Sequence, residues 1–172
     1  MKLGIISDTH ITNDYGKEKI SKLLNQLKEA FKDVDEIVHV GDVCQKFFLD
    51  ELKRIAPTRC VKGNLDKINH LENFIKFSIG QYNIGVIHIL PDKVEDFAKK
   101  HDLRILIFGH THQPLIKGTD KNLLLLNPGS PTEPKAPQEK PGFMKPVARP
   151  TVITLNIDED DILSVFIITL KN

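Results

Sequence analysis

The stretch KLGIISDTH, residues 2–10, joins a short apolar run directly to three polar residues. Residues 2–7 are rich in β-branched side chains and predict a buried β-strand that opens the chain. The strand pattern stops at Asp8-Thr9-His10, so a carboxylate and an imidazole follow a core element at once. Taken alone, this triplet fits a turn and helix entry as well as it fits a functional site.

Strand and helix patterns alternate beyond this first strand. Residues 17–32 carry apolar side chains on one helical face with charges opposite, which predicts an amphipathic helix. Residues 36–40 and 58–61 read as strands, and a shorter helix pattern around residues 48–55 lies between them. The order strand, helix, strand, helix, strand predicts a right-handed parallel sheet.

The middle of the chain repeats this theme. Residues 83–88 and 103–108 are apolar strand patterns, and a helix pattern lies between them. Asp92 and Glu95 have the spacing of a capping box that would open this helix.

Consecutive strand patterns then follow at residues 122–127, 151–157 and 162–170, with no helix pattern between them. They predict antiparallel strands that close the C-terminal side. The expected fold class is therefore α/β or α+β, with a mixed sheet or two packed sheets.

The length and one unusual segment define the expected domain organisation. A chain of 172 residues suits one domain, residues 1–172, with a sizeable core. Residues 131–150 contain six prolines and cannot form a regular helix or a central strand. This Pro-rich insertion is either a flexible surface loop or a loop that borders the active site, and the sequence leaves both open.

Composition excludes several classes of partner. The 24 basic and 23 acidic residues nearly balance, so we expect no general nucleic-acid binding and no membrane-surface binding. Cys44 and Cys60 lack metal-binding spacing, and we find neither a signal peptide nor a long apolar run. The expectation is a soluble, cytoplasmic enzyme or binding module, and a homo-oligomer stays open.

Polar side chains that can bind metal gather at the ends of the predicted strands. The carboxyl ends of strands in an open α/β sheet border one crevice where ligands bind. Each motif alone has a simpler explanation, because Gly-Asp and Gly-Asn pairs usually form turns and a lone histidine is usually a core residue. The ordered set predicts a shared site, whose members are Asp8, His10, Asp42, Asn64, His88, His110 and His112.

The residue types narrow the chemistry of this site. Imidazole, carboxylate and amide donors without a thiolate disfavour a structural zinc site and suit manganese, iron, cobalt, nickel or catalytic zinc. Seven ligands exceed the need of one four-coordinate ion but fit two ions that share a carboxylate. Alternate residues of an extended chain point the same way, so we expect Asp8 with His10, and His110 with His112, to enter the crevice together.

Charge also points to a substrate class. Two divalent ions, the carboxylates of Asp8 and Asp42, and one hydroxide sum to a net charge of about +1 facing the substrate. This charge matches a phosphodiester and would also bind a phosphomonoester. Phosphoester hydrolysis is the leading hypothesis.

Five motifs in order carry a resemblance to a known family: SDTH (7–10), HVGD (39–42), GNLD (63–66), GHTH (109–112) and NPGS (127–130). Together they resemble the calcineurin-like metallophosphoesterases. Within that superfamily they look most like the compact phosphodiesterase subgroup that includes YfcE-type enzymes and the retromer subunit Vps29. The resemblance covers residues 1–130.

The resemblance implies a β-sandwich of mixed sheets flanked by helices, and it divides the ligands between two metals. One metal would be held by Asp8, His10, Asp42 and His112, and the other by Asp42, Asn64, His88 and His110. Asp42 would bridge the two ions, manganese being the first expectation and nickel, iron, cobalt or zinc the alternatives. Asn64 and His110 are also expected to act in catalysis, since the Asn64 amide can approach a phosphoryl oxygen.

Four further residues qualify this reading. His39 and Asp66 are candidates for supporting the ligands from behind, although Asp66 fits a turn cap equally well. Many relatives have histidine where Leu65 stands, so protonation of the leaving group would fall to water or to another residue. Ile89 stands where relatives usually have glycine.

Three functions follow in order of preference. The first is a phosphodiesterase for a small phosphoester or nucleotide, with a metal-bound hydroxide attacking phosphorus in line. The second is a Vps29-like protein-binding scaffold with weak or no hydrolysis. The third is a phosphomonoesterase or nuclease on the same centre.

Overall fold

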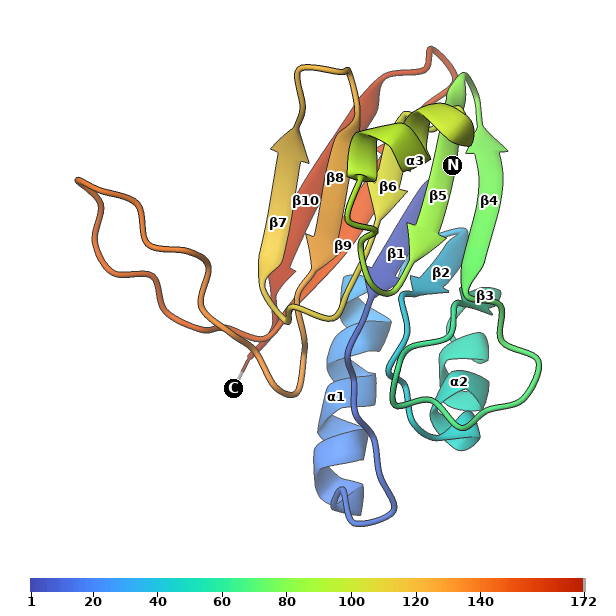
Figure 1. Ribbon diagram of the computed structural model, residues 1–172. Helices are drawn as coiled ribbons and strands as arrows, with labels where there is room; N and C mark the ends of the chain where they lie inside the picture. The colour runs from blue at the N-terminus through green and yellow to red at the C-terminus, as the bar shows by residue number, and fades with distance from the viewer. Residues whose placement is uncertain (172) are drawn as a thin grey trace.

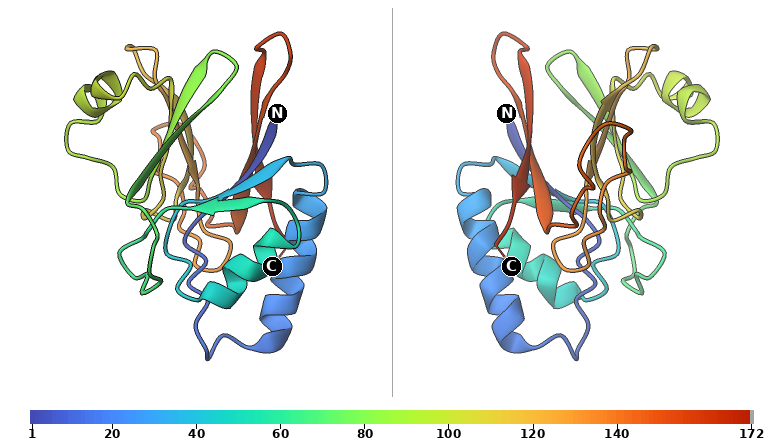
Figure 2. Two further views of the ribbon diagram at one scale, coloured as in Figure 1. Left: turned by 90° about the vertical axis from the view of Figure 1, so that its right-hand side faces the viewer. Right: turned by 90° about the vertical axis from the view of Figure 1, so that its left-hand side faces the viewer.

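Two five-stranded sheets pack face to face, with helices on their outer faces, in the computed structural model of the protein (Figures 1 and 2). The structure describes residues 1–171. Each sheet contains both parallel and antiparallel pairs. This arrangement confirms the predicted α/β sandwich of mixed sheets flanked by helices.

The first sheet has the strand order β10-β9-β1-β2-β3. Its strands are β1 (Lys2–Ile6), β2 (Glu36–His39), β3 (Thr58–Cys60), β9 (Thr151–Ile157) and β10 (Leu163–Thr169). Strands β1, β2 and β3 run parallel, as their alternation with helices predicted. Strand β9 returns antiparallel to β1, and β10 pairs antiparallel with β9.

The second sheet has the order β4-β5-β6-β8-β7. Its strands are β4 (Phe74–Ile79), β5 (Tyr82–Ile87), β6 (Ile105–Ile107), β7 (Pro114–Gly118) and β8 (Leu124–Pro128). Strands β4 and β7 were not predicted. The predicted antiparallel pairing of the later strands is confirmed for β9 and β10. Strand β8 pairs antiparallel with the unpredicted β7 and runs parallel to β6.

Three helices cover the sheets: α1 (Lys17–Ala30), α2 (Lys46–Lys53) and α3 (Val94–Lys100). The predicted capping box at α3 is wrong. Lys93 occupies the N-cap position and no side chain caps the helix, because Asp92 lies one residue too early. Among residues 1–171, we find no helix with the length and apolarity that a membrane crossing requires.

Strand periodicity divides the core into layers. In β1, Leu3 and Ile5 face the second sheet, whereas Ile6 faces the cluster beneath α1 and α2. Gly4 also faces this cluster, and a Cβ there would lie 2.7 Å from the ring of Phe31. A third cluster packs beneath α3, around Leu106. Because both faces of β1 are buried, its sequence is a continuous apolar run.

Residues 131–150 contain neither helix nor strand and form an arm that stands away from the sheets (Figure 1, orange). The start of the arm lies beside the strand ends, where the His112 ring nitrogen Nδ1 meets the Glu133 carbonyl oxygen at 2.7 Å. The outer part exposes Phe143, Met144 and Val147. The first residues of the insertion thus border the candidate site, and the rest of the insertion extends away from it.

Candidate metal centre

Loops at the carboxyl ends of five strands meet at one end of the sandwich and carry all seven predicted ligands. Backbone hydrogen bonds join these loops to one another: the Asp8 and His10 N–H groups donate to the carbonyls of Gly41 and Asp42, each at 3.0 Å. The Gly109 N–H donates to the His88 carbonyl at 3.0 Å. These bonds extend the strand pairing into the ligand loops and fix their spacing.

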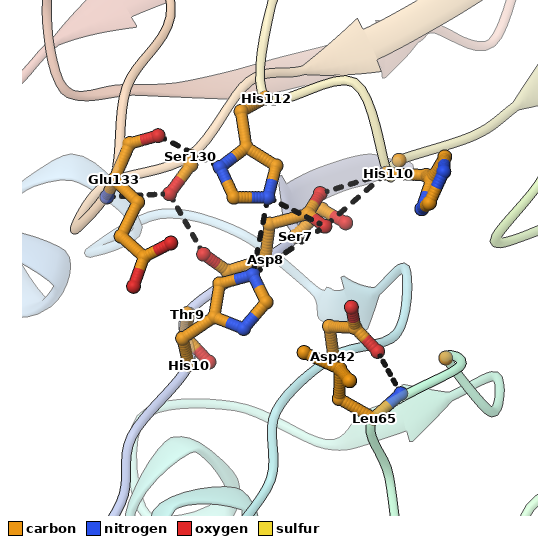
Figure 3. A network of polar contacts seen from close by, with 12 residues as sticks. Ser7, Asp8, Thr9, His10, Asp42, Leu65, His110, His112, Ser130 and Glu133 are labelled. Carbon is orange, nitrogen blue, oxygen red and sulfur yellow. Dashed lines mark hydrogen bonds and ion pairs between the residues drawn. The ribbon is translucent and has the colours of Figure 1, made fainter.

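The first group of potential ligands is Asp8, His10 and His112 (Figure 3). The Asp8 Oδ1 atom lies 3.5 Å from the His112 Nε2 atom and 3.9 Å from the His10 Nε2 atom. The two Nε2 atoms are 3.1 Å apart. These atoms lie close enough together to bind a single ion.

The second group is Asp8, Asp42 and His88, with Asn64 beside it. The His88 Nε2 atom lies 3.3 Å from Asp42 Oδ2 and 3.9 Å from Asp8 Oδ1. The Asn64 Oδ1 atom is 3.1 Å from His88 Nε2 and 3.1 Å from His110 Nδ1.

Ligand atoms lie within 4.8 Å of one another in each group, and Asp8 belongs to both. Asp42 belongs to the second group only. The bridging role that the family resemblance implies for Asp42 therefore stays a prediction.

Two histidines are oriented from behind by backbone carbonyls. The His88 Nδ1 atom lies 2.7 Å from the Val40 carbonyl oxygen, and His112 Nδ1 lies 2.7 Å from that of Glu133. A carbonyl only accepts hydrogen bonds, so each ring carries a hydrogen on Nδ1 and donates it. On the neutral rings the Nε2 lone pairs are then free to bind a metal, which is the common arrangement of histidine ligands.

Burial and charge at the two carboxylates favour a bound cation. Asp8 is 0% and Asp42 is 2% exposed, and both form ion-pair contacts with histidines. Burial raises the pKa of Asp8. Burial acts the same way on Asp42, but hydrogen bonds from His88 and from the Leu65 N–H outweigh it and lower the pKa of Asp42. Burial likewise opposes charging of His88, yet Asp42 and the Val40 carbonyl raise the pKa of this imidazole.

The ligand loops are not extended, contrary to the prediction. Both members of each histidine motif have positive φ angles: 52° at Asp8, 44° at His10, 66° at His110 and 59° at His112. Asp42 has a φ of 54°. The left-handed conformation curls each loop tightly past the end of its strand, and this curl directs alternate side chains into the centre.

Glycines before two ligands allow close approach of the loops. A Cβ at Gly63 would lie 2.1 Å from Asp42 Oδ1, and a Cβ at Gly109 would lie 2.8 Å from Asp8 Oδ2 and 2.1 Å from Ser7 Oγ. A side chain at either position would displace a carboxylate of the centre.

Asp66 and His39 lie behind the ligands, at the two positions proposed for support. The buried Asp66 carboxylate accepts hydrogen bonds from the N–H groups of Asp42, Gly63 and Cys44 at 2.9, 2.8 and 2.7 Å. The fully buried His39 ring contacts Thr9 Oγ1 through Nε2 at 3.1 Å. Burial lowers the pKa of His39 to about 3.

Two supporting residues, Asn127 and Ser130, were missed from the sequence. Asn127 Nδ2 donates to the Gly109 carbonyl at 2.9 Å and to Thr111 Oγ1 at 3.1 Å, which holds the GHTH loop. The Ser130 hydroxyl donates to the Asp8 carbonyl at 2.7 Å (Figure 3). The NPGS motif contains both residues and was the available signal, but nothing in the sequence showed which loop each side chain would reach.

Leu65 and Ile89 direct apolar side chains outward beside the centre. They are 53% and 47% exposed. The Leu65 N–H donates to Asp42 Oδ1 at 2.8 Å. The β-branched Ile89 leaves the contact of His88 with the Val40 carbonyl in place.

Comparisons with known proteins agree with this geometry. Residues 1–157 match the model of the calcineurin-like phosphoesterase superfamily domain. A "Probable metallophosphoesterase" of Methanothermobacter thermautotrophicus is 34% identical over 166 residues, which cover 92% of this chain and 87% of the relative.

Two solved structures are similar in fold. One, described as a novel archaeal phosphodiesterase, has a TM-score of 0.66 and 25% identity, with 98% of this chain and 100% of that chain covered. Wild-type Vps29 of Entamoeba histolytica, complexed with zinc, has a TM-score of 0.72 and 23% identity, with 98% and 99% covered. With the family model matched over most of its length and its metal-ligand types gathered at one end of the sandwich, the chain belongs to the calcineurin-like phosphoesterase superfamily and is a metallophosphoesterase-type protein.

Proposed function

We propose that this protein is a metal-dependent phosphodiesterase with a dinuclear metal centre. The observation that carries the proposal is the pair of ligand groups joined at Asp8. One group of three ligands would serve a single ion. Two groups that share a carboxylate suit two ions held close together. The proposed ligands are Asp8, His10, Asp42, Asn64, His88, His110 and His112.

The donor set fits divalent transition metals. Buried carboxylates lose their hydration, and a cation compensates this loss more completely than neutral imidazoles do. Mixed nitrogen and oxygen donors suit manganese, which we propose first, and also nickel, iron, cobalt or zinc. When bound, two such ions supply charge stabilisation and lower the pKa of a water nucleophile toward neutrality.

Asn64 and His110 lie on the open side of the centre, where a substrate would arrive. Both residues are exposed, in contrast to the buried Asp8 and Asp42. The Asn64 Oδ1 atom faces the rings of His88 and His110, so its amide hydrogens point elsewhere and can donate to a phosphoryl oxygen. We therefore assign substrate-contacting roles to Asn64 and His110.

The charge of the centre matches a singly charged phosphodiester, although the centre would also bind a dianionic monoester. The two buried carboxylates leave about one net positive charge facing the substrate once two ions and a nucleophilic hydroxide are counted. The similar archaeal phosphodiesterase also favours a diester substrate for this chain. A small phosphoester or a nucleotide is the proposed substrate class.

The test compares hydrolysis of an activated phosphodiester with that of the monoester carrying the same leaving group. Manganese or nickel is added to chelator-treated protein. We expect diester hydrolysis in wild type and at least about a 100-fold loss in two variants: Asp42→Asn, which replaces a carboxylate ligand by a neutral amide, and His110→Gly, which removes a ligand. Asparagine and glycine both tolerate the positive φ at these positions. His70→Asn is the matched control, because His70 also has positive φ but is exposed and lies outside the ligand set. Equal rates in wild type and both ligand variants would refute the assignment.

A scaffold function is the second candidate. The observation that favours it is the pair of exposed apolar side chains, Leu65 and Ile89, beside the metal ligands. The fold is also similar to that of Vps29, the protein whose resemblance in sequence motifs suggested a scaffold role. Metal binding without hydrolysis of any ester would favour the scaffold. Faster hydrolysis of the monoester than of the diester would instead favour a phosphomonoesterase. Cleavage of oligonucleotides would favour a nuclease.

A further inference from the structure

Strand β10 is an edge strand with a free outer side. It is the first strand of its sheet, and no strand within residues 1–171 pairs with its outer edge. Its seven residues, LSVFIIT, pair continuously with β9 and contain no charged residue and no proline. A regular edge of this kind presents unpaired backbone N–H and C=O groups to another strand.

The other three sheet edges carry features that discourage such pairing. Strand β4 contains Lys76, and β7 contains both Lys117 and Pro114. Strand β3 has only three residues and contains Arg59. Charges, proline and short length are the usual protections of edge strands. Within the described residues, β10 is the edge that lacks all of them.

Apolar side chains near this edge are also exposed. Phe166 and Ile162 are each 63% exposed, and Ile167 is 41% exposed. Exposed large apolar side chains along a free strand edge are typical of protein–protein interfaces.

We propose that β10 pairs antiparallel with β10 of a second copy of this chain, so that the two first sheets join into one. The occupant is a second copy because the strand is complementary to itself. A two-fold axis at Phe166, the middle residue of β10, sets the Phe166 side chains of the two copies against each other.

The same axis brings opposite charges together. Residues 158–161, which are all acidic, precede the strand, and Lys171 follows it. Antiparallel pairing about Phe166 places the acidic turn of one copy at the Lys171 end of the other. Leu163 then lies opposite Thr169, and Asp161 lies level with Lys171. A parallel arrangement would instead place acidic turn beside acidic turn.

Charge reversal at the centre tests both the surface and the register. Sedimentation velocity at about 100 µM is expected to show a dimer for wild type. Phe166→Lys and Phe166→Glu each place like charges opposite one another, so each should weaken association at least about tenfold. An equimolar mixture of the two variants pairs opposite charges and should restore a heterodimer. Circular dichroism should show that each variant is folded, because Phe166 is exposed and its replacement leaves the core intact.

Phe143→Lys is the matched control, because Phe143 is 78% exposed on the arm and lies outside β10. This variant should dimerise like wild type. The proposal is overturned if wild type is a monomer at this concentration, or if Phe166→Lys dimerises as well as wild type does. Failure of the mixture to associate would overturn the position of the axis at Phe166.

Discussion

Replacing Asp66 should destabilise the metal centre without removing any proposed ligand. Each hydrogen bond to a carboxylate contributes about 1.5–3 kcal/mol, and Asp66 accepts three. Asp66→Ala removes all three hydrogen bonds, but water can enter the space. We therefore expect the free energy of unfolding to fall by about 4 kcal/mol rather than by the full sum. In Asp66→Asn the amide oxygen still accepts hydrogen bonds from the N–H groups of Asp42 and Gly63, but its NH₂ group faces the Cys44 N–H and cannot accept from it. The free energy of unfolding should then fall by about 2 kcal/mol.

Chemical denaturation in the presence of a chelator measures this effect without metal binding. For a domain of this size, Asp66→Ala should also lower the melting temperature by roughly 8–16 °C. Metal affinity measured by calorimetry should fall about 10- to 100-fold, because Asp66 positions the loops of Asp42 and Asn64. Asp92→Ala is the control and should change stability by less than about 0.5 kcal/mol, since Asp92 is exposed and caps no helix. A loss below about 1 kcal/mol in Asp66→Ala would show that these contacts do not hold the loops.

Three further predictions concern the ligands and their surroundings. Gly109→Ala should abolish tight metal binding while the sheets stay folded, because its Cβ would collide with Ser7 Oγ and press on the Asp8 carboxylate; unchanged metal affinity in calorimetry would contradict this. Adding manganese at about 100 times its dissociation constant should stabilise the chelator-treated protein by about 2.7 kcal/mol for each ion bound, and identical denaturation curves would argue against a native-state site. The pKa of His39 is lowered to about 3, so the unfolded chain takes up a proton first as the pH falls below about 6.5. Wild type should therefore lose about 1.4 kcal/mol per pH unit below that point relative to His39→Gln, and parallel pH profiles would refute the burial of a neutral ring.

The layered fold could be predicted wherever a strand is buried on both faces. Strand β1 is a continuous apolar run after Lys2, and β9 is rich in β-branched residues although it contains Asn156. The bounds of both strands were predicted to within one residue. Strand β4 was missed because Lys76 interrupts a strand that is only half buried. Strand β7 was missed because Pro114 and Gly118 are disfavoured in strands, although both are tolerated at a sheet edge. Without β7, the sequence could not show that β8 runs parallel to β6.

The candidate site was predictable in its residue types and not in its backbone. Side chains such as Asp8 and His112 could be placed together because parallel strands end at one edge. Their left-handed φ angles could not be foreseen, since histidine favours that region only weakly and the curl depends on neighbouring loops. The contact of the Ser130 hydroxyl with the Asp8 carbonyl joins residues 122 positions apart, and no local pattern encodes such a pairing.

The positive φ angles explain why the backbones of the ligand loops need so many hydrogen bonds from neighbouring side chains. Each non-glycine residue in the left-handed region costs roughly 1–2 kcal/mol, and five of the seven proposed ligands lie there. Neutral imidazoles and buried carboxylates attract one another too weakly to hold such a conformation. The carboxylate of Asp66, the amide of Asn127 and the hydroxyl of Ser130 instead fix three separate ligand loops through their backbones. The lone pairs of the ligands are thereby oriented before a cation binds. Metal binding does not have to order the loops, so less of its free energy is spent on conformational entropy and the affinity is higher.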